Sequence, residues 1–97
     1  MLGHDRCGAV EAAIDVVTKG FVPPGEIGAA TAPIVPAVQA VQGQPADQLL
    51  NAAIQENVKM TVQSLGQVPT LAELVQGGKL KIVGYEYQLH TGKVTAV

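Results

Sequence analysis

The chain has 97 residues, and six Lys and Arg against eight Asp and Glu give it a formal net charge of −2. Hydrophobic residues make up 47% of the sequence but aromatic residues only 3%, so Val, Ile, Leu and Ala must build any core. The length fits one small domain over residues 1–97. The few scattered basic residues exclude a phosphate-binding stripe, and with it a nucleic-acid-binding protein.

The sequence also bears on the compartment. With one cysteine the chain forms no internal disulfide, which fits a reducing compartment. Asp5 and Arg6 stand near the start with no apolar run after them, which is not the pattern of a signal peptide. No stretch approaches the roughly 18 apolar residues that a membrane span needs. We therefore expect a cytoplasmic protein with no membrane partner.

The first predicted elements are a strand and a helix. Residues 1–3 resemble the last residues of a strand. An amphipathic helix follows over residues 9–20, because apolar side chains recur at i, i+3, i+4 and i+7 until Gly20. These side chains are Val10, Ala13, Ile14 and Val17.

Two further helices are predicted in the middle of the chain. Consecutive prolines make residues 21–25 a loop. Apolar spacing around residues 34–41 indicates a short helix, in which Pro33 and Pro36 are tolerated only in a first turn or at a kink. A longer helix follows, with one apolar face made of Leu50, Ile54, Val58, Thr61, Val62 and Leu65.

The C-terminal third is predicted to change from helix to strand. Thr70 as N-cap and Glu73 as its capping-box partner indicate a short helix that closes at residues 77–78. Apolar and polar residues then alternate over residues 83–89, which predicts a strand, and after a turn at 90–93 a second strand returns over 94–97. One hairpin is marginal alone in water, so we expect other strands beside it.

The candidate chemistry lies at the first turn. His4 and Cys7, the only cysteine, stand three positions apart, and imidazole and thiolate are both good zinc donors. Zinc takes four ligands in structural sites and three plus water in catalytic ones. The pair is therefore half of a metal site, and on spacing alone a capping histidine with a buried thiol is the commoner arrangement.

Two motifs resemble those of the β-class carbonic anhydrases. One is similar to the family's second metal-ligand motif at a strand-to-helix turn, and the other, which begins at residues 78–84, is similar to its C-terminal strand pair. The resemblance covers essentially all 97 residues and corresponds to the C-terminal half of the family. The motifs read Leu2-Gly3-His4-x-x-Cys7-Gly8-Ala9-Val10 and Tyr87-x-Leu89-x-Thr91-Gly92-Lys93-Val94.

The resemblance implies a truncated α/β fold, with helices packed on a small, mostly parallel sheet that ends in an antiparallel C-terminal strand. It also implies a Zn²⁺ ion held by one His and two Cys, with His4 and Cys7 as the second and third ligands. The family's first cysteine lies in an upstream Cys-x-Asp-x-Arg motif, which does not occur in this sequence. Asp5 and Arg6 do not match the Asp and Arg of that motif, so no catalytic residue is assigned.

Other candidate residues are better explained by structure. His90 could be a third donor, but its position in a Thr-Gly turn favours a solvated turn residue. Tyr85 and Tyr87 point to one side of a strand, which favours core or interface packing over catalysis.

Three functions remain open on the sequence. The first is a carbonic anhydrase-related protein, whose family reaction is the zinc-dependent interconversion of carbon dioxide and bicarbonate, incomplete in this chain alone. The second is a non-catalytic dimer in which two copies share one zinc through His4 and Cys7. The third is a metal-free interaction module. Each of them predicts a homo-oligomer or another assembly, because missing strands leave an open sheet edge.

Overall fold

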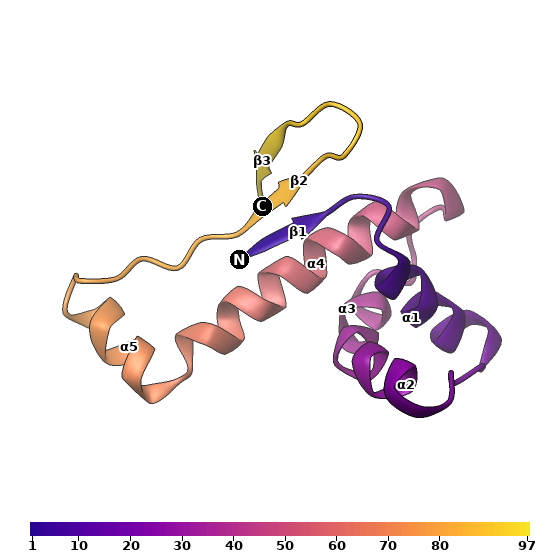
Figure 1. Ribbon diagram of the computed structural model, residues 1–97, viewed down its shortest axis with the longest axis horizontal. Helices are drawn as coiled ribbons and strands as arrows, with labels where there is room; N and C mark the ends of the chain where they lie inside the picture. The colour runs from indigo at the N-terminus through magenta and orange to yellow at the C-terminus, as the bar shows by residue number, and fades with distance from the viewer.

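A computed structural model describes all 97 residues as a small sheet packed on a long helix, with a group of short helices at one end (Figure 1). The elements in chain order are β1 (Leu2–His4), α1 (Gly8–Lys19), α2 (Gly25–Thr31), the 3₁₀ turn η1 (Ala32–Ile34), α3 (Val35–Ala40), α4 (Ala46–Gly66), α5 (Pro69–Gln76), β2 (Tyr85–Tyr87) and β3 (Val94–Ala96).

The sheet has the order β1-β2-β3 and joins the two ends of the chain. β1 pairs with β2 in parallel, with Gly3 opposite Glu86, and β2 pairs with β3 antiparallel, with Glu86 opposite Thr95. The predicted α/β fold, its N-terminal strand and its antiparallel C-terminal strand are therefore confirmed. The strand predicted over residues 83–89 is too long, because β1 and β3 both pair with β2 only over Tyr85–Tyr87.

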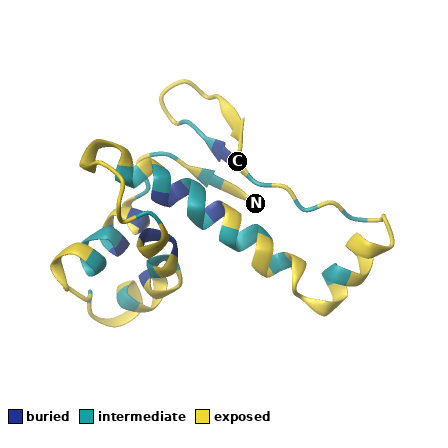
Figure 2. Cartoon of the chain, turned by 180° about the vertical axis from the view of Figure 1, so that it is seen from behind, coloured by how far each residue is buried: buried dark blue, intermediate teal, exposed yellow.

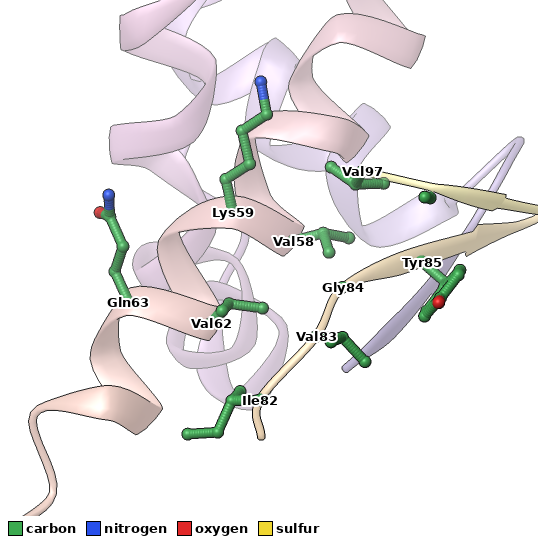
Figure 3. Close-up of a pocket in the computed structure, with 10 residues that line it drawn as sticks. Val58, Lys59, Val62, Gln63, Ile82, Val83, Gly84, Tyr85 and Val97 are labelled. Atoms are coloured by element: carbon green, nitrogen blue, oxygen red, sulfur yellow. The ribbon is translucent and has the colours of Figure 1, made fainter. Parts of the chain in front are cut away.

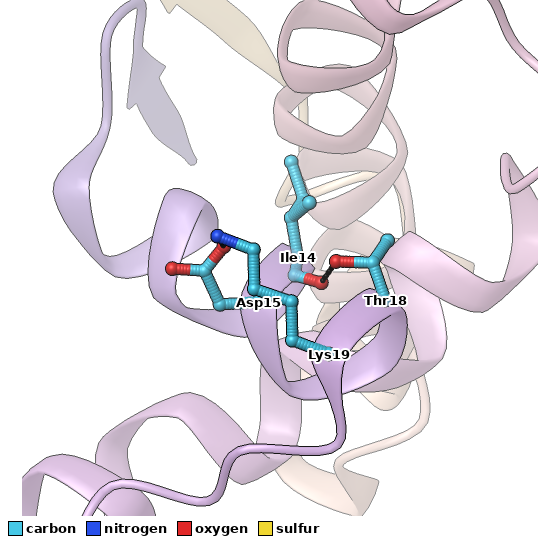
Figure 4. A network of polar contacts seen from close by, with 4 residues as sticks. All are labelled: Ile14, Asp15, Thr18 and Lys19. Carbon is cyan, nitrogen blue, oxygen red and sulfur yellow. Dashed lines mark hydrogen bonds and ion pairs between the residues drawn. The ribbon is translucent and has the colours of Figure 1, made fainter.

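The first helix follows its prediction closely. α1 ends at Gly20, which has the left-handed φ of 69° and donates its N–H to the Val16 carbonyl. Thr18 Oγ1 donates to the Ile14 carbonyl at 2.8 Å, and the Lys19 ammonium lies 3.5 Å from the Asp15 carboxylate (Figure 4). Both contacts join neighbouring turns of the helix on its solvent side.

Two helix starts differ from the prediction. α2 was not predicted, because Gly25 and Gly28 lower helix propensity in a seven-residue segment. α5 begins at Pro69 with Val68 as N-cap and no side-chain capping bond, so the predicted Thr70 capping box is wrong. Proline suits the first helical position because its φ is preset and its missing N–H would have had no partner.

The core is built from small aliphatic side chains where α1, α3 and α4 meet (Figure 2). Its buried members are Val10, Ala13, Val38, Ala53 and Ile54. Val10 and Ala13 confirm the apolar face predicted for the first helix, and Ile54 lies on the face predicted for the long helix, whereas Ala53 was not in that prediction. No helix combines the length and the hydropathy that crossing a bilayer would require.

The sheet lies unusually close to α4 because glycines face the helix. A Cβ at Gly3 would lie 2.6 Å from Val58 Cγ2, and a Cβ at Gly84 would lie 2.6 Å from Val58 Cγ1. Real Cβ atoms do not approach this closely, so neither position accepts a side chain without movement. The two glycines therefore set the spacing between α4 and the strands.

The molecule exposes more surface than its mass predicts. Its accessible surface is 6302 Å², whereas a compact monomer of 10.0 kDa exposes about 5,200 Å². Its radius of gyration is 14.6 Å, above the about 13 Å of a compact 100-residue domain. Much of this extent comes from an arm, residues 59–84, which holds the end of α4, α5 and the extended segment before β2 (Figure 1). None of the α5 residues is buried.

Candidate metal site

The candidate ligands flank a tight turn between β1 and α1. Arg6 in this turn has a φ of 52°, a left-handed conformation that is uncommon for residues other than glycine. The Asp5 N–H donates to the Tyr87 carbonyl at 3.0 Å, and the Leu89 N–H donates to Asp5 Oδ1 at 2.9 Å. Both bonds fasten the turn to β2 and the loop that follows it. Sequence reasoning assigned Asp5 no role, and the structure gives it this anchoring one.

His4 presents one ring nitrogen for a ligand. Its Nδ1 lies 2.8 Å from the Asp5 carbonyl oxygen, and a carbonyl can only accept a hydrogen bond. Nδ1 therefore carries the proton of the neutral ring, and Nε2 keeps a free lone pair. The side chain is exposed. A histidine held through Nδ1 by a backbone carbonyl is the common arrangement of metal-binding histidines.

Cys7 occupies the N-cap of α1 with extended backbone, and its side chain makes no capping bond. The thiol is free and half-buried, and the side chain packs against the core cluster. His4 does not cap the helix either, since its hydrogen bond goes to Asp5. His4 is therefore not a capping histidine. Cys7, in contrast, packs as a small apolar side chain, as the non-metal interpretation of the sequence expects.

A hollow of about 170 Å³ borders both candidate ligands. It lies between β1 and α4, and six of its nine lining residues are hydrophobic. His4 and Cys7 are the only His, Cys, Asp or Glu side chains that line it, and nowhere in the structure do three or more such side chains lie so that they could hold a metal ion. His90 is exposed in the loop between β2 and β3, as predicted for a turn residue. The chain thus provides two donors at one turn.

A larger groove lies elsewhere and does not touch the candidate ligands. It has a volume of about 430 Å³ and runs between α4 and the extended segment that leads into β2 (Figure 3). Val58 and Val62 point from α4 toward Gly84, and Lys59 and Gln63 point away from the strands. The groove is mainly apolar and offers no pair of acid-base or ligand groups.

A buried polar pair beside β1 was missed by sequence reasoning. Glu86 has 1% of its surface exposed and faces α4, where Gln55 Nε2 donates to Glu86 Oε1 at 3.2 Å. The other carboxylate oxygen has no partner. The alternation pattern in β2 suggested the opposite arrangement, but Tyr85 is 38% exposed on the far face of the sheet. Of the two expected roles of Tyr85, core packing is therefore not observed, and interface packing stays a prediction.

Comparison with known proteins gives a consistent match along the chain. A family model described as carbonic anhydrase matches residues 1–94. Two curated proteins named carbonic anhydrase 2, from two strains of Mycobacterium tuberculosis, are each 33% identical over 94 residues. The match covers 96% of this chain but only 45% of each relative, so the chain spans less than half of their length.

Solved structures share the fold. The β-carbonic anhydrase CcaA matches with a TM-score of 0.75 and 20% identity, over 96% of this chain and 47% of that one. The β-carbonic anhydrase CafD of the filamentous fungus Aspergillus fumigatus matches with a TM-score of 0.69 and 22% identity, over 99% of this chain and 54% of that one. The fold therefore corresponds to about half of each of these enzymes.

Proposed function

This chain belongs to the carbonic anhydrase family, and we propose that it supplies the His4 and Cys7 ligands of a zinc site for the reversible hydration of carbon dioxide to bicarbonate. The chain forms one partial domain over residues 1–97 in this proposal. Polypeptide outside these residues provides the remaining protein ligand, because two donors leave a zinc ion without the three protein ligands of a catalytic site.

The main support for the proposal is that both donor atoms, Nε2 of His4 and Sγ of Cys7, are free to bind a metal. The His4 tautomer leaves Nε2 free, and the Cys7 thiol is unpaired one turn away. Imidazole and thiolate together suit zinc better than calcium or magnesium, which prefer oxygen ligands. Zinc bound in such a site acts as a Lewis acid and makes water acidic enough to supply hydroxide near neutral pH.

The residues of this chain have three tasks in the site. His4 and Cys7 bind the ion through Nε2 and Sγ. Asp5 orients the imidazole through its carbonyl oxygen, and its side chain fastens the turn to the Leu89 N–H. Because these hydrogen bonds are already present without zinc, the turn needs little rearrangement to bind the ion. No residue of the chain is assigned to proton transfer.

Zinc titration tests the ligand assignment. We expect His4→Ala and Cys7→Ser each to lower zinc affinity at least tenfold, because each removes half of the donors that this chain provides. His90→Ala is the matched control, since it removes the other histidine, which is exposed in a loop. Equal affinities in all four proteins would contradict the assignment.

Zinc content and native mass separate the alternatives. One zinc per two chains, in a dimer that dissociates with chelator, would indicate the shared Cys₂His₂ site. No bound zinc at millimolar excess would indicate the metal-free module. Carbon dioxide hydration no faster than in buffer by the folded, zinc-loaded chain would confine catalysis to an assembly with further polypeptide.

Two finer statements also belong to the proposal. We place the protein in the cytoplasm, because the Cys7 thiol must stay reduced to bind a metal. We also propose a homo-oligomer, formed through the arm defined above. Val68, Leu74 and Val75 in the arm are 43%, 39% and 41% exposed, which is unusual for so many apolar side chains on one segment.

A further inference from the structure

We propose that the loop between α1 and α2 docks into the apolar groove of a second copy of this chain and places Phe21 and Val22 there. The loop, residues 20–24, lies at the opposite end of the molecule from α5 (Figure 1). The groove is the one between α4 and the segment that leads into β2, and much of its lining belongs to the arm. The inference rests on the proposed self-association through the arm, and it names the surface that the arm meets.

Three large apolar side chains in this loop and the helix after it are exposed. Phe21, Val22 and Ile27 are 60%, 68% and 60% exposed, and Phe21 is the only phenylalanine of the chain. None of them belongs to the core cluster or to the residues packed against it. The loop is remote from the sheet, so the open face of the sheet does not explain their exposure (Figure 1). Exposed apolar side chains that gather in this way are typical of a contact surface.

The backbone holds the loop in a fixed shape. Gly20 and Gly25 at its two ends have φ values of 69° and 63°, which residues with a side chain seldom adopt. Pro23 and Pro24 have their φ preset by the ring, and Pro24 has the polyproline conformation with φ −73° and ψ 157°. α2 packs directly on the loop, because a Cβ at Gly28 would clash with the Pro23 carbonyl oxygen. Docking therefore costs little conformational entropy.

The groove offers a receptor of suitable size and polarity. Its volume of about 430 Å³ lies in the range of pockets that enclose a small organic ligand, so it has room for a phenyl ring and a neighbouring aliphatic side chain. Val58 and Val62 form its α4 side, and Ile82 and Val83 form its strand side (Figure 3). Burial of exposed apolar side chains against these residues is the driving force of the proposed contact.

The charges at the two surfaces are complementary. Glu26 precedes Ile27 in the first turn of α2 and is exposed, and Lys59 lines the groove. Neither has an ion-pair partner, because the only ion pair of the structure joins Lys19 to Asp15. In the proposed contact, Glu26 of one copy pairs with Lys59 of the next. Such a pair at the rim of an interface adds little affinity, but it fixes the orientation of the partner.

The contact is head-to-tail, because the loop and the groove are different surfaces of one chain. Each added copy brings a further free groove or loop, so association continues beyond two copies unless the rotation closes a ring. A contact in which one patch meets the same patch of the partner stops at a dimer. The mass distribution therefore distinguishes the two kinds of contact.

Loop and groove variants test the contact separately. We expect Phe21→Ser and Val83→Asp each to raise the concentration of half-association at least tenfold by light scattering, because one empties the loop and the other puts a charge in the groove. Leu89→Ser is the matched control, since it removes a side chain of similar exposure from the loop between β2 and β3, and it should change this concentration less than twofold. Circular dichroism verifies that each variant is folded.

Mixing the two variants gives a sharper test of the head-to-tail arrangement. The Phe21→Ser chain keeps its groove and the Val83→Asp chain keeps its loop, so an equimolar mixture should form a 1:1 heterodimer that grows no further. Each variant alone should stay monomeric at the same concentration. Native mass measures all three samples.

A charge exchange tests the occupant at exposed positions that do not endanger the fold. Glu26→Lys and Lys59→Glu should each weaken association at least threefold at low salt, because each sets like charges against one another. The double variant carries the pair in reverse and should return to within about twofold of the unmodified chain.

The outcomes separate this inference from the proposed homo-oligomer. Association that Leu74→Lys weakens and Phe21→Ser does not would leave the oligomer standing and overturn the docking loop. A species that never exceeds two copies, or a double charge variant no better than the single ones, would overturn it too. A chain that stays monomeric at its highest soluble concentration would refute both.

Discussion

At the scale of single residues, the geometry of the candidate site depends on Asp5. Its carbonyl fixes the His4 tautomer, its N–H joins β2, and its carboxylate accepts the Leu89 N–H. A sequence pattern can point to His4 and Cys7 as candidate ligands, because zinc sites use particular residue types at short spacing. It does not show the anchoring role of Asp5, because the residues to which Asp5 is anchored, Tyr87 and Leu89, lie more than 80 residues further along the chain.

Substitutions at Asp5 test the contribution of its side-chain hydrogen bond, because they leave its backbone hydrogen bonds in place. Asp5→Ala should lower the free energy of unfolding by about 1–2 kcal/mol, because it removes the acceptor of the Leu89 N–H. Asp5→Asn keeps an oxygen at the same place and should lose less than half of that. Urea unfolding gives the free energies and amide exchange at residue 89 locates the effect. Equal exchange rates at that amide in all three proteins would contradict the anchoring role.

The buried Gln55–Glu86 pair gives a second residue-level prediction. Gln55→Leu should destabilise the fold by about 1–3 kcal/mol, because Glu86 then has no donor in a buried place. The double variant Gln55→Leu, Glu86→Leu should recover most of the loss, since no buried polar group remains unpaired. Gln63→Leu, exposed on the same helix, is the control and should change stability by less than about 0.5 kcal/mol. If the double variant instead lost the sum of the stability losses of the two single variants, the Gln55 and Glu86 side chains would not be coupled.

At the scale of elements, the periodicity of apolar residues predicted the helices that have a buried face. It failed for β2, where the packing of neighbouring elements determines which face is buried. α1 and α4 were predictable because their apolar side chains recur over three or more turns. In β2 the alternation was correct, but the face that packs on α4 carries Gly84 and Glu86 while the tyrosines face out. The more apolar face of the sheet is therefore the open one, and the local pattern does not contain which face packs on the helix.

The close approach of α4 to the sheet can be tested through its glycines. Gly84→Ala should destabilise the fold by about 1–3 kcal/mol, because its Cβ would lie 2.6 Å from Val58 Cγ1 and 3.2 Å from Val62 Cγ2. Val58 is buried and β-branched, so it cannot rotate away. Adding Val58→Ala to Gly84→Ala should cost less than the sum of the two single changes, as thermal unfolding would show.

Gly66→Ala, at the end of α4, serves as the control, because a Cβ there meets nothing within 4 Å. We expect it to leave stability unchanged or to raise it by up to about 1 kcal/mol. If Gly84→Ala were as harmless as Gly66→Ala, the sheet and α4 would not be in the close contact described above.

At the scale of the whole molecule, the chain is more extended than a compact domain of its length. Nine of its 97 residues are buried, and its surface exceeds that of a compact monomer. Length and composition could not predict this, because 47% hydrophobic residues suffice for an ordinary core. The excess results from topology: the three short strands expose one face and both outer edges of the sheet, and the arm extends past the sheet.

The arm gives the prediction at this scale. Leu74→Lys should shift any self-association of the chain to at least tenfold higher concentration, because Leu74 is 39% exposed on a helix without buried residues. Its effect on the free energy of unfolding should be small. Glu73→Lys introduces the same side chain at the neighbouring polar position and should leave association nearly unchanged. Light scattering over a dilution series measures the concentration at which half of each protein is associated. The same concentration for all three proteins would show that Leu74 is not in the self-association contact.

The pairing of β1 with β2 has a consequence for the order of events during biosynthesis. The Met1 nitrogen and the Val83 carbonyl are 82 residues apart, and the Leu89 N–H that fastens Asp5 is 84 residues away from it. Closing so long a loop is slow compared with forming α1 or α4. On the ribosome, the helices can therefore form while the ligand turn is still loose, and the turn becomes fixed only after residue 89 has left the exit tunnel.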